Sequence, residues 1–246
     1  MLSDVEAVLF DMGGTLVDYP IPSWPILFTR CAQGMYGYLV RPEGERPPPA
    51  AAFPDPAGGL LRPTPTGPDT ALAHRAMVAL RRIVRSLSDR TLPHMAEACA
   101  RPLTADGKLY DDTLPTLGEL RARGYRLGLV SNTPWGTPEY LWVSQLDRFG
   151  LTAWFEVRIF SSHFGVRKPN PRIFQAALDA LGVAAPRAVF VGDNPRADIA
   201  GAARLGMRSV LIARPGWNLP RVTKTPDLTI ETLSDLLAHL PAAAKK

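Results

Sequence analysis

Short apolar runs alternate with amphipathic stretches along most of the chain, and this alternation constrains the fold more than any other feature. The apolar runs are rich in β-branched and aromatic residues and end at glycines or polar turns, as strands buried on both faces do. Between them, amphipathic stretches end at a glycine, where a helix C-cap is expected. The predicted strands are 7–10, 125–130, 155–160, 188–191 and 209–212, and the predicted helices include 113–123, 171–181 and 198–205.

Strands that alternate with helices predict an α/β domain built on a doubly wound, Rossmann-like parallel sheet. In such a domain the functional site lies at the carboxyl ends of the strands. After Ile212 the pattern is less regular, and residues 227–230 and 232–240 are predicted as a last strand and helix. The chain has 246 residues and is 46% apolar, which is ample for a buried core.

The alternation is interrupted between residues 18 and 107. Residues 20–39 and 70–88 are predicted to be helical, and apolar residues recur at helical spacing in the second of these stretches. Between them, residues 41–68 contain nine prolines and four glycines, a composition that cannot continue a helix or a sheet ladder. We therefore predict that residues 1–17 and 108–246 form the core, and that 18–107 form an inserted helical cap with a surface loop at 41–68.

Charge and cysteine content exclude several classes of protein. The 28 Lys and Arg residues exceed the 23 Asp and Glu residues, but no dense basic run accompanies this excess, so nucleic acid is not an expected partner. Cys31 and Cys99 form no CxxC motif and are expected to be free, buried thiols in a reducing compartment. No basic leader and no apolar stretch of about 18 residues is present. The expectation is a cytosolic protein without a membrane partner, and the sequence carries no indication of its oligomeric state.

Four polar segments follow predicted strands in chain order. Asp11 comes directly after strand 7–10, and the next glycines lack a Cβ, so that backbone amides can approach an anion. Taken singly, each segment has an ordinary alternative: a turn, a strand ending, or the N-cap of a helix near Ala197. Their common order favours one shared site. The candidate residues of that site are Asp11, Ser131, Asn132, Lys168, Asp193 and Asp198.

The segments VLFDMGGTL, LVSNT, GVRKPNPRIF and VGDNPRADIAGA resemble the four motifs of the haloacid dehalogenase-like (HAD) hydrolases, most of which are phosphatases. The resemblance covers nearly the whole chain outside the predicted cap. It implies that Asp11 is a nucleophile that takes the phosphoryl group as an aspartyl-phosphate. It also implies that Lys168 neutralises the nucleophile and the transferring phosphate.

The same resemblance implies a phosphate site, a metal site and a class of substrate. The phosphate oxygens would contact Gly14, Thr15, Ser131, Asn132 and Lys168. Magnesium prefers oxygen ligands and retains waters, so two carboxylates and one carbonyl can hold it. The implied Mg²⁺ ligands are Asp11, the backbone carbonyl of Gly13, and Asp193, with Asp198 as a direct, water-mediated or outer ligand. The implied substrate is a small phosphorylated metabolite, selected by the cap.

The first motif departs from the family pattern at Gly13. The family reads DxDGT, whereas this chain reads DMGGT. The missing aspartate is the family's general acid/base, a role worth roughly 10²- to 10⁴-fold in rate. We expect metal and phosphate binding to be retained, and activity to be slow or restricted to good leaving groups.

Other residues could supply a proton or line the site. His74, His94 and His163 titrate near neutral pH, although each could equally be a surface or packing histidine. Asp18 could approach the site or mark the hinge into the cap. The tryptophans of the segment NTPWGTPEYLW, Trp135 and Trp142, could line a substrate pocket or pack in the interior.

Two alternative functions stay open. Gly13 and the proline-rich segment are compatible with a catalytically impaired phosphate-binding or protein-interaction module. A metal-independent 2-haloacid dehalogenase is disfavoured because Asp193 and Asp198 are both present. A phosphonate hydrolase is disfavoured because residues 18–107 contain no lysine to form its Schiff base.

Overall fold

The computed structural model describes residues 2, 4–20, 24–39, 92–134, 137–216 and 224–242. The predicted helix 70–88 and the proline-rich segment 41–68 lie outside the described residues. The chain divides into two compact units. The first comprises Met1–Asp18, Lys108–Asn132 and Leu146–Lys246, and the second comprises Tyr19–Gly107 and Thr133–Gln145.

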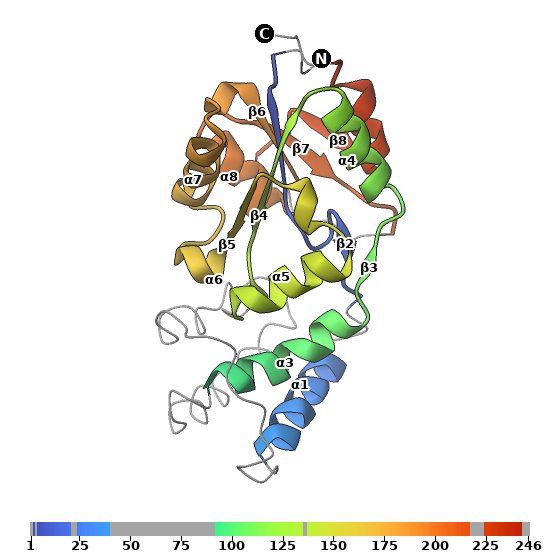
Figure 1. Ribbon diagram of the computed structural model, residues 1–246, viewed down its shortest axis with the longest axis vertical. Coiled ribbons are helices and arrows are strands. Elements are labelled where there is room, and N and C mark those ends of the chain that lie inside the picture. The colour runs from blue at the N-terminus through green and yellow to red at the C-terminus, as the bar shows by residue number, and fades with distance from the viewer. Residues whose placement is uncertain are drawn as a thin grey trace. The chain divides into compact units, whose positions relative to one another are not determined.

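A six-stranded parallel sheet forms the centre of the first unit, in the order β5-β4-β1-β6-β7-β8 (Figure 1). Strand β1 therefore lies between β4 and β6, and Leu9 pairs with Gly128 on one side and with Phe190 on the other. The predicted α/β fold with a parallel sheet is confirmed. The strands are β1 (Ala7–Phe10), β4 (Arg126–Ser131), β5 (Val157–Phe160), β6 (Ala188–Gly192), β7 (Arg208–Ile212) and β8 (Leu228–Ile230).

Helices flank this sheet on both faces, as in a doubly wound fold. Helices α7 (Pro171–Leu181) and α8 (Ala200–Ala203) lie on one side, and α4 (Thr113–Ala122) lies on the other with the 3-10 helix η6 (Leu233–Ala238) (Figure 1). The shorter elements of this unit are η3 (Thr152–Trp154), α6 (Ser161–Phe164) and η4 (Ala185–Arg187). A separate antiparallel pair joins β2 (Val17–Asp18) to β3 (Lys108–Leu109).

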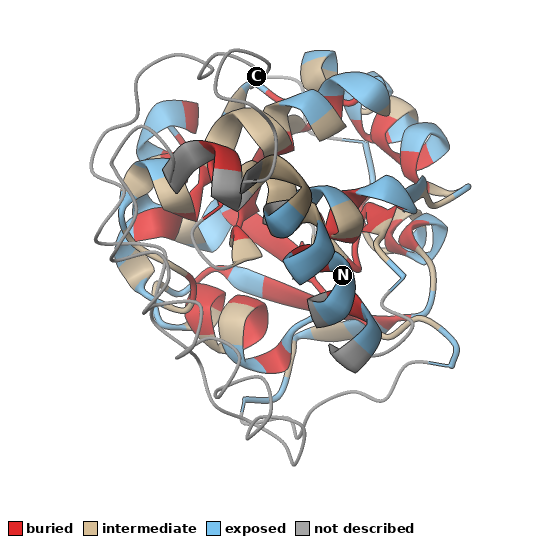
Figure 2. Cartoon of the chain, turned by 90° about the horizontal axis from the view of Figure 1, so that it is seen from below, coloured by how far each residue is buried: buried red, intermediate tan, exposed pale blue. Residues whose placement is uncertain are grey.

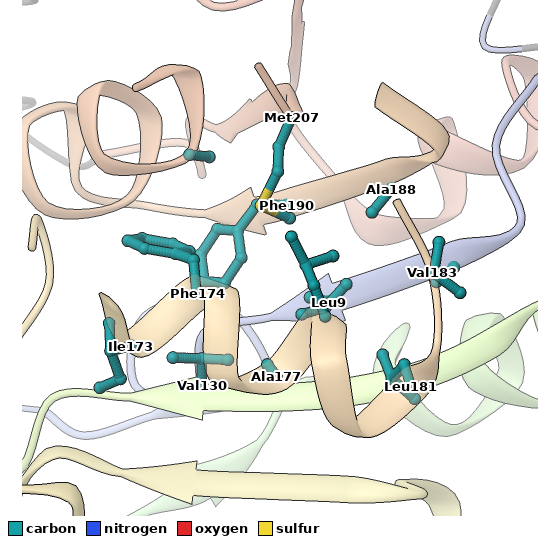
Figure 3. Packing of buried hydrophobic residues seen from close by; sticks show 13 residues of the cluster. Leu9, Val130, Ile173, Phe174, Ala177, Leu181, Val183, Ala188, Phe190 and Met207 are labelled. Atoms are coloured by element: carbon teal, nitrogen blue, oxygen red, sulfur yellow. The ribbon is translucent and has the colours of Figure 1, made fainter. Parts of the chain in front are cut away.

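One face of α7 is buried against the sheet and supplies much of the hydrophobic core (Figure 3). Phe174 of this helix meets Phe190 of β6 edge to face, with ring centroids 4.9 Å apart. Gly128 leaves room for the helix, because a Cβ there would lie 3.2 Å from both Leu181 and Leu9. Buried residues gather on the strands and exposed ones on the outer helix faces (Figure 2), as the apolar runs predict.

Helix ends follow the sequence in one place and depart from it in another. Helix α7 begins after Asn170, which caps it, and ends at Gly182 with φ 60°, as predicted. The predicted helix 198–205 instead starts earlier, as a π-helical turn η5 (Pro195–Ile199) followed by α8. The reason is Asn194, whose side chain accepts hydrogen bonds from two backbone N–H groups of that turn. The N-cap alternative for Asp193 and Asp198 is therefore wrong.

The second unit is described mainly through a pair of helices. Helices α1 (Trp24–Leu39) and α3 (Leu92–Ala105) pack against each other (Figure 1). They approach closely at Gly34, where a Cβ would lie 2.5 Å from the carbonyl oxygen of Ala98. Residues 139–145 of α5 (Glu139–Arg148) belong to this unit. Within the described residues, no helix has both the length and the apolar character that crossing a membrane requires.

Candidate active site

Three adjacent strands end in polar residues at one edge of the sheet. Asp11 follows β1, Ser131 is the last residue of β4, and Asp193 follows β6. Because the strands are parallel and β1 lies between the other two, their carboxyl ends meet. The candidate site is thus built where the fold class predicts it.

Three carboxylates converge at this edge. Asp11, Asp193 and Asp198 each offer an oxygen, and these oxygens lie within 4.8 Å of one another. Asp198 is fully buried, and its Oδ2 accepts a hydrogen bond from the N–H of Asn194 at 2.9 Å. Gly192 makes this approach possible, because a Cβ there would lie 2.4 Å from the Asp198 carboxylate.

Lys168 lies between two of the carboxylates. Its Nζ is 2.7 Å from Asp11 Oδ1 and 2.8 Å from Asp198 Oδ1, and its side chain is only 1% exposed. Burial lowers the pKa of this ammonium group, but the two carboxylates outweigh burial, so the net shift of the pKa is upward. Lys168 is therefore held in its charged form.

The positive charge of Lys168 does not balance the negative charge of the three carboxylates. Burial raises the pKa of Asp193 well above its ordinary value, and the negative charges of Asp11 and Asp198 raise it further. Burial likewise raises the pKa of Asp198 to about 6, although Lys168 opposes the shift. Three oxygen donors with an excess of negative charge fit a hard divalent cation such as Mg²⁺.

The loop after Asp11 is a tight turn. The N–H groups of Leu16 and Val17 both donate to the carbonyl of Met12, and Gly14 N–H donates to the carbonyl of Val17. Gly14 has φ 79°, a conformation that favours glycine, whereas Gly13 is not among the glycines with positive φ. This turn lies directly beside the predicted nucleophile.

Asn132, the residue after β4, forms two hydrogen bonds with the main chain of Lys168. Its Oδ1 accepts a hydrogen bond from Lys168 N–H at 2.9 Å, and its Nδ2 donates to the Lys168 carbonyl at 3.1 Å. The neighbouring Ser131 is buried at the strand end. The structure therefore brings the predicted residues of β1, β4, β6 and the Lys168 segment together.

A half-buried ion pair beside this loop was not predicted. Arg214, which follows β7, binds both carboxylate oxygens of Asp112 at 3.1 and 3.0 Å and donates to the Thr15 carbonyl at 2.9 Å. Its guanidinium stacks 3.5 Å from the ring centroid of Tyr110, and Asp112 also accepts from Leu233 N–H at 2.8 Å. The sequence shows only that Arg214 is a charged residue just after an apolar strand. That position does not identify Asp112, 102 residues earlier, as its partner.

Two of the other candidates, His94 and Trp142, have packing contacts instead. In the second unit, His94 is buried and its ring stacks on that of Tyr38, with ring centroids 5.1 Å apart. Trp142 is buried too and donates from its Nε1 to Thr137 Oγ1. His163 is exposed on α6, and Asp18 of β2 lies opposite Lys108 of β3 in the register of the antiparallel pair. His74 and Trp135 lie outside the described residues.

Comparisons with known proteins point in one direction. The chain matches the family model of haloacid dehalogenase-like hydrolases over residues 5–206. It is 39% identical over 141 residues to a glyceraldehyde 3-phosphate phosphatase of Methanopyrus kandleri, covering 56% of this chain and 59% of that relative, or less than two thirds of the relative's length. It is 29% identical over 255 residues to a phosphoglycolate phosphatase of Shigella boydii, covering 96% and 93% of the two chains. A solved HAD phosphatase of Thermococcus onnurineus is 25% identical with a TM-score of 0.61, covering 96% and 97%.

Proposed function

Because the chain belongs to the haloacid dehalogenase-like hydrolases, we propose that it is a magnesium-dependent phosphatase of small phosphorylated metabolites. The observation that carries this proposal is the buried Lys168 ammonium, 2.7 Å from Asp11, within a cluster of three carboxylates at adjacent strand ends. The relatives named above support the substrate class, since glyceraldehyde 3-phosphate and phosphoglycolate are small phosphorylated molecules.

In the proposed reaction, a carboxylate oxygen of Asp11 attacks the phosphorus atom, the bond from phosphorus to the ester oxygen breaks, and the leaving group departs as an oxyanion that takes a proton from water. A water oxygen then attacks the phosphorus of the aspartyl-phosphate, which releases inorganic phosphate and restores Asp11. Lys168 offsets the negative charge that the transferring group brings to the site. The phosphate oxygens are bound by the Ser131 hydroxyl and by the backbone N–H groups of Thr15 and Asn132, whereas the Gly14 N–H donates to the Val17 carbonyl within the loop.

Magnesium fits the donor set of the site. Asp11, the Gly13 carbonyl and Asp193 would hold it, and Asp198 would bind it directly or through water. When bound, it supplies positive charge that the carboxylates and the phosphate require.

Gly13 determines which esters react. Position 13 has no side chain to protonate the leaving oxygen, so a strongly basic alkoxide leaves slowly. An acyl phosphate or a phenyl ester has a more weakly basic leaving group. We therefore propose that the enzyme is slow or restricted to good leaving groups.

The test is turnover of acetyl phosphate, p-nitrophenyl phosphate and a sugar phosphate with Mg²⁺. We expect rates to fall in that order, and Asp11→Asn to abolish all three. Asp179→Asn, a change on the exposed side of α7, is the matched control and should leave the rates unchanged. Absence of turnover with every substrate, or equal rates in the Asp11 variant, would overturn the proposal.

A second candidate is a catalytically impaired phosphate-binding or interaction module, which Gly13 favours. Beryllofluoride, a mimic of aspartyl-phosphate, separates the phosphatase from a module that binds an unphosphorylated ligand or partner, and turnover separates it from a module that only binds phosphate. The phosphatase should be stabilised by beryllofluoride with Mg²⁺, whereas a module that binds only an unphosphorylated ligand should not be. The 2-haloacid dehalogenase alternative predicts halide release without Mg²⁺, and the carboxylates of Asp193 and Asp198 argue against it.

A further inference from the structure

The side chain of Asn132 is bound at both its polar atoms by the main chain of one residue, Lys168. The N–H of Lys168 can only donate and its carbonyl can only accept, so the amide of Asn132 fits in one orientation. One acceptor site and one donor proton of Asn132 are thereby committed to Lys168. A side chain used in this way is poorly placed to act mainly as a substrate ligand.

Lys168 has no regular element to fix its main chain. Helix α6 ends at Phe164 and α7 begins at Pro171, so Lys168 lies in the connection between them. Its side chain is long and has four rotatable bonds, yet its Nζ must lie within 2.8 Å of Asp11 and Asp198 together. Small displacements at the base of this side chain would move the ammonium group away from the carboxylates.

We infer that Asn132 is a positioning residue for Lys168. The inference rests on the proposed function, because it assigns Asn132 two roles in the phosphatase reaction. Its backbone N–H contacts the phosphate, and its side chain holds Lys168 at a fixed separation from that N–H. An uncharged amide suits this role, since a carboxylate at position 132 would lose the donor and add a negative charge near Asp11.

The kinetic test compares Asn132→Ala and Asn132→Asp with the wild type, using acetyl phosphate and Mg²⁺. Misplacement of a catalytic group by about 1 Å can cost about 10²-fold, so we expect kcat to fall by about 10- to 100-fold in both variants. KM should change by less than about threefold, because the interaction acts on the transferring group and not on substrate binding. An increase in KM with unchanged kcat would assign the side chain to the substrate and overturn the inference.

Asn170→Ala is the matched control. Asn170 also binds a main-chain N–H, that of Arg172, at 3.0 Å, but it caps α7, and no hydrogen bond joins its side chain to Lys168 among the described residues. This variant should lower the melting temperature and keep kcat within about twofold. An equal loss of kcat in Asn170→Ala would show a general effect of the segment and overturn the specific role of Asn132.

Amide hydrogen exchange gives a readout that does not depend on turnover. Exchange at Lys168 N–H should accelerate by about tenfold or more in Asn132→Ala, since its acceptor is lost, and should stay slow in Asn132→Asp, which keeps an acceptor. Unchanged exchange in Asn132→Ala would overturn the inference. If the wild type turned over no phosphoester, the proposed function would fail by itself, and the exchange experiment would still decide whether Asn132 holds Lys168.

Discussion

Gly13 lies in the turn after Asp11, and its φ is outside the positive range that only glycine adopts easily. An aspartate can therefore occupy this position without backbone strain. We expect Gly13→Asp to raise kcat for a sugar phosphate by about 10²- to 10⁴-fold, because a carboxyl group would then protonate the leaving oxygen. The rate with acetyl phosphate should change far less, since its leaving group needs little protonation.

Gly13→Asn controls for size and polarity at the same position. Its amide resembles the carboxyl group in shape but cannot transfer a proton, so its rates should stay near those of the wild type. Steady-state rates of the two variants on both substrates decide the matter. Equal gains in both variants would point to an effect other than proton transfer.

Single residues of the site differ in how far the sequence identifies them. Asp11 and Lys168 were predicted from ordered motifs and a family resemblance, and the structure places them 2.7 Å apart. The pairing of Arg214 with Asp112 was not predicted, because neither residue lies in a motif and the fold alone brings them together. The contact of Asn132 with Lys168 was hidden for the same reason.

The connection from β6 into η5 depends on one glycine. A Cβ on Gly192 would lie 2.4 Å from the Asp198 carboxylate, so Gly192→Ala must displace residues 193–198. We expect a loss of about 1–3 kcal/mol in the free energy of unfolding, as in overpacked cores, together with weaker Mg²⁺ binding. Chemical denaturation and a Mg²⁺ titration measure the two effects.

Gly118 provides the comparison within another element of the same unit. It lies inside α4, and a Cβ there would meet Trp154 at 3.6 Å, an ordinary contact. Gly118→Ala should therefore stabilise the protein by up to about 1 kcal/mol through helix propensity and leave Mg²⁺ binding unchanged. Similar losses in both variants would contradict the steric explanation for Gly192.

Strands were easier to predict than helix ends. Apolar runs buried on both faces specify strands directly, and β1 has the predicted bounds. Helix ends depend on capping contacts, so α7 has the predicted bounds whereas η5 does not. The start of η5 was missed because the side chain of Asn194 caps it, whereas the carboxylate of Asp198 accepts the N–H of Asn194 at the site. The predicted helix 232–240 is the shorter 3-10 helix η6, which begins at a capping box of Thr232 and Asp235.

At the scale of the whole chain, the inserted cap at 18–107 stays a prediction, and the second unit is described only in part. That unit also contains residues 133–145, which follow Asn132 directly. Tyr140 in this segment donates a hydrogen bond to Glu97 of α3 at 2.9 Å. Periodicity describes only local structure and does not reveal a contact between residues 43 positions apart. The sequence therefore could not assign residues 133–145 to the second unit.

The charge of the metal-free site affects the stability of the whole molecule. Burial raises the pKa of Asp198 to about 6 from an ordinary value of 3.8. Between these values the folded state binds more protons at this group than the unfolded state does, so the free energy of unfolding falls as pH rises. The difference between the pKa of 3.8 and the pKa of about 6 corresponds to about 3 kcal/mol of unfolding free energy, which is lost progressively between about pH 4 and pH 6.

We therefore expect Asp198→Asn to gain about 3 kcal/mol relative to the wild type in EDTA when pH rises from 4 to 7, because the variant lacks this titration. Asp179→Asn, which removes a charge from the exposed side of α7, should follow the wild-type profile.

Mg²⁺ at pH 7 should stabilise the wild type by about 2.7 kcal/mol at 100 times its dissociation constant, and Asp198→Asn by less. Denaturation curves at each pH measure these differences, and parallel profiles for the wild type and Asp198→Asn would show that the buried carboxylate is not the cause.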